Sequence, residues 1–205
     1  MGATKRYAEL LCLNKSISSS TNFLIVRFGN VLGSSGSVIP LFMEQINQNR
    51  EITITDKNIE RFFMSIVEAS QLVISSSKIG KSGDIFILDM GKSIKILKLA
   101  KDLIKYLGFS LSEIKIKFIG LRAGEKLYEE LLIGNNVTGT EHPRIMRAEE
   151  TMLPPEELEI KLHQLEKACH EFDIELIRKI LSESETSYDS TNEKIVNTWS
   201  KKDNQ

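Results

Sequence analysis

The sequence predicts an α/β fold, because short apolar runs alternate with amphipathic segments along most of its 205 residues. Two of the apolar runs, FLIVRF at 23–28 and DIFILD at 84–89, are almost continuous. Such runs are typical of strands buried on both faces of a parallel sheet. The segments between them repeat their apolar residues with the period of a helix. The expected architecture is therefore a sheet with helices packed on it.

In the first part of the chain the pattern changes from helix to strand and back. Tyr7, Leu10 and Leu11 fall on one face of a helix. Ser37 is expected to cap a later helix, in whose first turn Pro40 is tolerated because a backbone donor is not needed there. The predicted elements are, in order, helix 1–14, strand 23–28, a loop with three glycines and three serines at 29–37, helix 38–50 and strand 52–55.

The rest of the chain continues this alternation. Phe63, Ile66 and Ile74 are expected on the buried face of a helix, and Gly108 is expected to end another as its C′ residue. The predicted elements are helix 62–78, strand 84–89, helix 94–107 capped by Ser93, half-exposed strand 114–120, a short helix at 126–132 and helix 155–172. Residues 1–183 are predicted to fold, and the polar residues 184–205 to be a disordered tail.

Composition excludes several classes of function. The formal net charge is −1, from 27 basic and 28 acidic residues, which argues against nucleic-acid binding. No apolar run reaches the roughly 18 residues that span a bilayer, and no signal peptide is present. Cys12 and Cys169 match neither a disulfide framework nor a zinc spacing, and His142, His163 and His170 form no convincing metal set. A cytoplasmic setting is expected.

The loop after the strand at 23–28 is the first candidate site. In doubly wound sheets ligands bind at the carboxyl ends of strands, and Asn30 lies just past such an end. The N-terminus of the following helix would face an anion. The loop offers close backbone approach at Gly29, Gly33 and Gly36 and hydroxyl groups at Ser34, Ser35 and Ser37. A flexible surface loop explains these residues equally well.

Two arginines at element boundaries are the second candidate. Arg61 precedes the helix predicted at 62–78, and Arg122 begins RAGEK. Guanidinium groups grip diphosphates bidentately, although most arginines are solvated or form salt bridges. Glu125 and Glu129 are interpreted as charges at the start of a helix, favoured by its dipole.

Five long segments, taken in order, resemble one known family. MGATKRYAE, VRFGNVLGSSGSVIPLF, ERFFMSIVEASQLV, RAGEKLYEELL and EHPRIMRAEE are similar to the carboxy-terminal half of the polysaccharide-biosynthesis nucleotide-sugar 4,6-dehydratases. These are extended short-chain dehydrogenase/reductases and include UDP-N-acetylglucosamine 4,6-dehydratases and capsule enzymes. The resemblance covers about residues 1–175. It implies a Rossmann-type sheet with a small substrate-binding subdomain. The N-terminal nucleotide-binding half is expected to be missing, since no glycine-rich dinucleotide turn occurs in the sequence.

The resemblance implies a reaction that uses NAD without net redox change. The cofactor takes hydride from sugar C4, the resulting ketone acidifies the C5 proton, water leaves across C5 and C6, and hydride returns to C6. This chain is expected to be inactive without the missing half. Two alternatives stay open: a UDP-sugar-binding remnant without catalysis, or part of a 4-epimerase, in which hydride returns to C4.

The resemblance also assigns residues. Lys5 matches the lysine of the Tyr-x-x-x-Lys motif and would hold the nicotinamide ribose. Met1 stands at the usual tyrosine position and is not itself an acid or base. Phe28 and Gly29 would lie close to the nicotinamide, and Glu125 matches an acidic position of unassigned role. The implied UDP-sugar contacts are Asn30, Ser37, Val38, Leu41, Arg61 and Arg122.

Partners and location follow from the same resemblance. The expected partners are a UDP-sugar, a separate chain with the N-terminal nucleotide-binding half, and a further copy of this chain in a homo-oligomer. A missing N-terminal region would bring the cytoplasmic protein to the inner face of the membrane. No nucleic-acid partner and no membrane span within this chain are expected.

Overall fold

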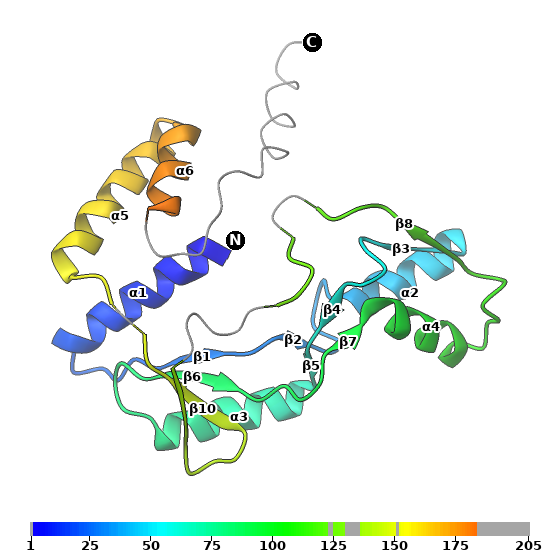
Figure 1. The fold of residues 1–205 in the computed structure, drawn as a ribbon, viewed down its shortest axis with the longest axis horizontal. Coiled ribbons are helices and arrows are strands. Elements are labelled where there is room, and N and C mark those ends of the chain that lie inside the picture. Colours follow the sequence, from blue (N-terminus) through cyan, green and yellow to red (C-terminus); the bar gives the residue numbers. More distant parts are fainter. Residues whose placement is uncertain (1, 123–124, 130–135, 151, 184–205) are drawn as a thin grey trace. The chain divides into compact units, whose positions relative to one another are not determined.

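The computed structural model describes residues 2–122, 125–129, 136–150 and 152–183. The chain divides into two compact units. The helical unit comprises Met1–Ile25, Gly80–Asp84 and Glu149–Gln205, and the α/β unit comprises Val26–Ile79 and Ile85–Ala148. Figure 1 labels their elements along the chain.

Among the described residues, the α/β unit consists of short strands and three helices. The four-stranded sheet has the order β1-β6-β10-β9, with β10 antiparallel to both neighbours. The pairs β2–β5 and β3–β8 are parallel, and β4–β7 is antiparallel. The elements are β1 Ile25–Arg27, β2 Asn30–Val31, α2 Val38–Asn49, β3 Glu51–Ile54, β4 Glu60–Arg61, β5 Phe63–Met64, α3 Ile66–Ile79, β6 Ile85–Leu88, β7 Ile94–Lys95, α4 Ile96–Tyr106, β8 Lys115–Phe118, β9 Val137–Gly139 and β10 Ile145–Ala148. The predicted α/β class is confirmed.

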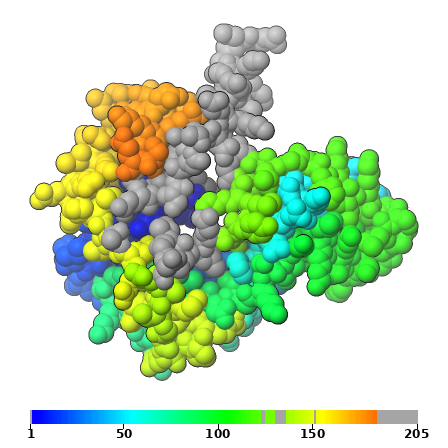
Figure 2. Space-filling model, in the orientation of Figure 1, coloured from blue at the N-terminus to red at the C-terminus, as the bar shows by residue number. Residues whose placement is uncertain are grey.

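The main core of the α/β unit lies among α2, α4 and the strands β3 and β8. Ile46, Ile52 and Ile104 are completely buried there. Gly108 follows α4 with a φ of 84°, so the expected C′ glycine ends this helix. The cyan and green side chains of these elements form one continuous mass on the face that Figure 2 shows. This packing fixes the N-terminus of α2 and the end of β3 relative to each other.

The helical unit contains α1 Gly2–Ser18, α5 Pro155–His170 and α6 Ile174–Ser182, which confirms the helices predicted at 1–14 and 155–172. Tyr7 and Ile180 belong to its buried cluster. Arg6 is buried and forms ion pairs with Glu150 at 2.8 Å and Glu9 at 3.1 Å. Because an unpaired charge in this place would be costly, the ion pairs hold α1 against the start of the segment that leads to α5.

The helix predicted at 62–78 is wrong at its start and in its face. Residues 63–64 form β5, and α3 begins only at Ile66. This helix buries Ala69, Leu72 and Ser76, whereas Ile66, Val67 and Ile74 are more than half exposed. Apolar residues lie on two faces of the segment, so its periodicity does not tell which one packs.

Two other predicted helix starts are also wrong. Residues 94–95 form β7, α4 begins at Ile96, and Lys95 rather than Ser93 occupies its N-cap position. The Ser93 hydroxyl instead donates to Glu60 Oε2 at 2.6 Å. Residues 126–129 are not helical, and the rest of that predicted helix lies outside the described residues, as does the tail predicted at 184–205. The antiparallel strands β9 and β10 were not predicted.

An ion pair joins α3 to the loop before β10. The Glu68 carboxylate accepts a hydrogen bond from Arg144, whose guanidinium also donates to the Asp89 carbonyl at 2.6 Å. Arg144 holds the pKa of Glu68 below its ordinary value, chiefly through that hydrogen bond. In the part of the chain that the structure describes, no helix is long and apolar enough to cross a bilayer.

Replacing Ile104 by Ala should destabilise the α/β unit by about 2–5 kcal/mol, because the change leaves a cavity in a closely packed core. Urea unfolding followed by circular dichroism measures this change. The control is Tyr106→Ala on the same helix, at a side chain that is 86% exposed. Equal losses in the two variants would contradict the proposed position of the core.

Candidate functional site

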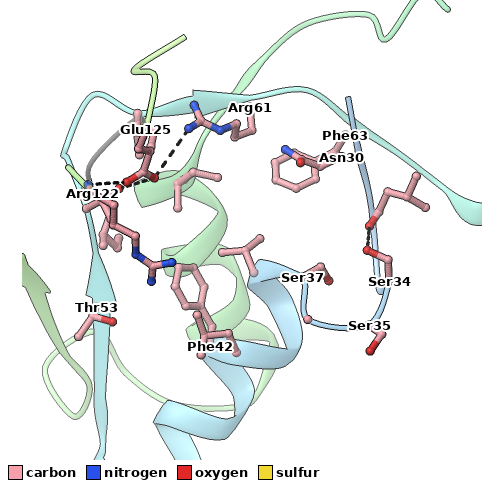
Figure 3. A pocket seen from close by; sticks show the side chains of 18 residues that line it. Asn30, Ser34, Ser35, Ser37, Phe42, Thr53, Arg61, Phe63, Arg122 and Glu125 are labelled. Atoms are coloured by element: carbon pink, nitrogen blue, oxygen red, sulfur yellow. Dashed lines mark hydrogen bonds and ion pairs between the residues drawn. The ribbon is translucent and has the colours of Figure 1, made fainter. Parts of the chain in front are cut away.

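A pocket of about 480 Å³ opens in the α/β unit, between the N-terminus of α2 and the ends of several strands. Figure 3 shows the side chains that line it. Apolar side chains form one part of the wall, among them Phe42, Ile54, Ile59, Phe63 and Ile96. Polar and charged groups form the rest, with Asn30, Ser34, Ser35, Ser37, Thr53, Thr55, Arg61, Arg122 and Glu125. The pocket thus combines an apolar surface with directed donors and acceptors, as small-molecule sites commonly do.

Asn30 is positioned by the pairing of β2 with β5. Its backbone N–H donates to the Phe62 carbonyl at 3.0 Å, and it lies opposite Phe63 in the register of the two strands. Its side-chain Nδ2 donates to Glu129 Oε1 at 3.2 Å. Among the described residues no other group pairs with this amide, so Oδ1 and the second N–H of Nδ2 are available to a ligand.

The serine-rich loop presents a buried hydroxyl group. Gly33 and Gly36 have φ angles of 74° and 71°, which let the loop turn sharply into α2. Ser37 occupies the N-cap position, but its side chain does not cap the helix. Its Oγ is buried and pairs with none of the described residues. Buried hydroxyls are normally paired, so this Oγ is an exception among the described residues, and it lies beside a helix N-terminus that favours anions.

Arg61 lies in the wall of the pocket with its guanidinium directed at the protein. Its Nη1 donates to the carbonyls of Glu60 at 2.7 Å and Leu127 at 3.1 Å, and its Nη2 to that of Lys126 at 2.7 Å. Its Nε lies 3.6 Å from Glu129 Oε1, and its Nη2 lies 3.8 Å from Glu125 Oε1. An arginine has five N–H groups, so this side chain is largely occupied in holding the segment 125–129.

Glu125 and Arg122 complete the charged side of the pocket. Glu125 Oε1 accepts from the Thr55 hydroxyl at 3.0 Å, and Oε2 accepts from the backbone N–H of Arg122 at 3.0 Å. The Arg122 guanidinium extends toward the pocket beside Phe42 (Figure 3) and pairs with none of the described residues. Among the described residues that line the pocket, Arg122 is therefore the cation whose donors remain available.

The structure brings six predicted ligand-binding residues to this one pocket. Asn30, Ser37, Val38, Leu41, Arg61 and Arg122 all line it. Phe28 and Gly29 belong to the same unit but do not line the pocket. Lys5 is exposed on α1 in the helical unit, and Met1 lies outside the described residues. The functional roles assigned to all these residues stay predictions.

The residues predicted to bind NAD fit only part of such a cofactor. Lys5 has the right chemistry for a ribose hydroxyl. One side of Gly29 is filled by protein, since an added Cβ would meet the Phe62 Cβ at 3.0 Å and Glu129 Oε2 at 3.1 Å. No glycine-rich turn for a dinucleotide pyrophosphate occurs in the 205 residues. These residues do not form a dinucleotide site by themselves.

Sequence reasoning missed several residues of the site. Glu129 was interpreted as a charge at a helix start, but it contacts Asn30 and Arg61. The strand ITIT alternates at period two, which could have placed Thr53 and Thr55 together opposite the core. Gln45 fixes Thr53 by donating to its Oγ1 at 2.7 Å and accepting from its N–H at 3.0 Å.

The sequence of this chain is similar to known proteins of one family. Residues 1–150 match the family described as "Polysaccharide biosynthesis protein". The probable polysaccharide biosynthesis protein EpsC of Bacillus subtilis is 51% identical over 137 residues, which cover 67% of this chain and 23% of that protein. The chain thus spans less than a quarter of this curated relative's length.

Two solved structures are also similar. The structure of Pen from Bacillus thuringiensis has a TM-score of 0.63 and 38% identity, covering 79% of this chain and 56% of that one. The UDP-N-acetylglucosamine 4-epimerase from Methanobrevibacter ruminantium M1, in complex with UDP-N-acetylmuramic acid, has a TM-score of 0.50 and 25% identity, covering 60% and 41%. The fold is that of extended short-chain dehydrogenase/reductases, as expected from the sequence.

Replacing Arg61 by Lys should destabilise the α/β unit by about 1–3 kcal/mol, because one ammonium group cannot serve all the acceptors that the two terminal guanidinium nitrogens reach. Urea unfolding measures the change. The matched control is Arg122→Lys, at a guanidinium that pairs with none of the described residues. The assignment of Arg61 as a clamp fails if both variants are as stable as the parent chain.

Proposed function

This chain belongs to the polysaccharide biosynthesis protein family, and on that premise we propose that it carries the sugar-nucleotide-binding part of an enzyme that processes UDP-sugars. One observation carries the proposal. One pocket is lined by the Arg122 guanidinium, which pairs with no described residue, by the buried Ser37 hydroxyl, by the Asn30 amide and by apolar side chains. A nucleoside diphosphate sugar needs such a combination, since it joins a flat base to a doubly charged diphosphate.

Each part of the pocket has a proposed role. Arg122 takes the diphosphate with two parallel N–H groups, which a point charge cannot do. Asn30 and the N-terminus of α2 contact the phosphates from the strand end. Ser37, Val38 and Leu41 close over the uridine. Arg61 lines the same wall, where its charge lies near the diphosphate while its donors hold the segment 125–129. A volume of about 480 Å³ lies within the range of small-molecule sites.

The proposed reaction is 4,6-dehydration of a UDP-N-acetylglucosamine-like sugar, a lyase reaction that serves surface polysaccharide synthesis. Lys5 would hold a nicotinamide ribose, with Phe28 and Gly29 near the ring and Met1 at the usual tyrosine position. The chemistry of the NAD cofactor, which accepts and returns hydride, needs a dinucleotide site that this chain's residues do not form. We therefore propose that the chain is inactive until a separate chain supplies that half.

A second candidate function is 4-epimerisation. It is favoured by the similarity to the UDP-N-acetylglucosamine 4-epimerase from Methanobrevibacter ruminantium M1. The two reactions share the sugar-nucleotide contacts and differ in the carbon to which hydride returns, so the pocket described above serves both. A third candidate is a UDP-sugar-binding remnant without catalysis.

Replacing Arg122 by Ala should weaken UDP binding by about 1.5–3 kcal/mol, the scale of a charge-assisted hydrogen-bonded contact. Isothermal titration calorimetry with UDP measures the loss. Arg122→Lys should recover only part of the affinity, because one point charge replaces a fork. Lys105→Ala, near the end of α4 and outside the pocket, is the control. Unchanged affinity in a folded Arg122→Ala variant would remove this residue from the site.

Turnover should require a second chain. The purified chain alone is expected to bind UDP-N-acetylglucosamine without converting it. Mixed with a chain that carries a nucleotide-binding half and NAD, it should yield the 4-keto-6-deoxy product, detected by mass spectrometry as the loss of one water. If the C4 epimer forms instead, the proposed 4,6-dehydration is contradicted and 4-epimerisation is supported. If a stable complex binds UDP but converts no substrate, the proposed catalysis is contradicted, and the chain is a UDP-sugar-binding remnant.

A further inference from the structure

Glu129 contacts the candidate site from outside the pocket. Its neighbours Asn30 and Arg61 line the pocket, whereas Glu129 does not. Its side chain is 23% exposed, and that of Arg61 is 15% exposed. A partly buried carboxylate that contacts two wall residues without entering the pocket is placed to act through them.

The Glu129 carboxylate has partners on three sides. Oε1 accepts from Asn30 Nδ2 at 3.2 Å and lies 3.6 Å from Arg61 Nε. Oε2 accepts from the backbone N–H of Phe62 at 3.3 Å. The same peptide segment also binds the Asn30 backbone, because the Phe62 carbonyl accepts from the Asn30 N–H at 3.0 Å. Asn30 is thus held through both its backbone and its side chain.

Gly29 gives this carboxylate room to approach. The residue does not have a positive φ, so a left-handed backbone does not explain the glycine. A Cβ at this position would lie 3.1 Å from Glu129 Oε2 and 3.0 Å from the Phe62 Cβ. Any larger residue would push the carboxylate away or displace the β2–β5 pair. The contact between Glu129 and Asn30 therefore depends on the absence of a side chain at Gly29.

A carboxylate partner fixes the orientation of an asparagine amide. An ionised carboxylate only accepts hydrogen bonds, so it pairs with Nδ2 and not with Oδ1. Rotating the amide by half a turn would bring two acceptor oxygens together. Because Nδ2 is held by Glu129, the directions of the Asn30 Oδ1 and of the second side-chain N–H are also fixed. Arg61 lies beside the carboxylate and balances its charge, which limits repulsion of an anionic ligand.

We propose that Glu129 is a positioning residue that orients the Asn30 amide for a nucleoside diphosphate, with Arg61 holding Glu129 in place. The inference rests on the proposed function, in which Asn30 contacts the phosphates. It adds to that function a residue that acts through Asn30 and does not touch the ligand. Arg61 also donates to two backbone carbonyls of the segment 125–129, which ends at Glu129.

The test is a double-mutant cycle on UDP affinity in the full chain. Glu129→Ala should weaken UDP binding roughly tenfold, the scale of one hydrogen bond to a charged group. In an Asn30→Ala background the same change should alter affinity by less than about twofold, because coupled residues are not additive. Glu44→Ala, on the exposed side of α2, is the control. Equal losses from Glu129→Ala in both backgrounds would overturn the positioning role.

A second measurement needs no ligand. Nitrogen-15 NMR of the full chain should show one side-chain N–H of Asn30 protected from exchange, and Glu129→Ala should remove that protection while the backbone signals of β2 persist. If Asn30→Ala leaves UDP affinity unchanged, the proposed role of Asn30 in binding fails, yet the NMR result still reports on the Glu129 contact. An Asn30 side chain that exchanges equally fast in both proteins would overturn the inference.

Discussion

The occupied guanidinium of Arg61 is the interaction on which the candidate site depends. It donates hydrogen bonds to the carbonyls of Lys126 and Leu127 and lies near the carboxylates of Glu125 and Glu129. These acceptors lie more than 60 positions further along the chain, so one side chain of β4 fixes a segment that has no helix or strand structure. A backbone without helix or strand pairing must satisfy its carbonyls elsewhere, and Arg61 does this for two of them. The site is therefore assembled around an arginine that is used structurally.

The small core beneath the site provides the rigid frame. The parallel pair β3–β8 lies with α2 and α4 in one buried cluster, which places the N-terminus of α2 next to the end of β3. Thr53 and Thr55 follow from this placement, because alternate residues of a strand face opposite sides. Gln45 of α2 then fixes Thr53 across the gap between helix and strand. Polar groups in the pocket are thus oriented by residues that do not line it.

Elements that are set by local hydrophobic spacing could be predicted from the sequence. Features that depend on contacts between distant segments could not. The runs at 23–28 and 84–89 gave strands, and the period of 38–50 gave a helix, since hydrophobic spacing decides both. The segment 62–78 has apolar residues on two faces, so only the packed structure shows that Ala69 and Leu72 face inward. The helix predicted at 126–132 is absent over residues 126–129, because Arg61 takes the carbonyls that a helix would use. The contacts of Glu129 could not be predicted either, because its partners lie far away in the sequence, in β2 and at the junction of β4 and β5.

Arg61 and Arg122 look equivalent in the sequence, and the structure separates them by what their donors meet. Glu125 and Glu129 both lie beside the Arg61 guanidinium, whereas the Arg122 guanidinium pairs with none of the described residues. The two carboxylates therefore weaken the attraction of Arg61 for an anion. What remains is directional: the open fork of Arg122, the held amide of Asn30 and the N–H groups at the start of α2. In the proposed function, recognition by such groups depends on the position of each acceptor atom on the ligand, which would favour one shape of diphosphate ester over phosphate in general.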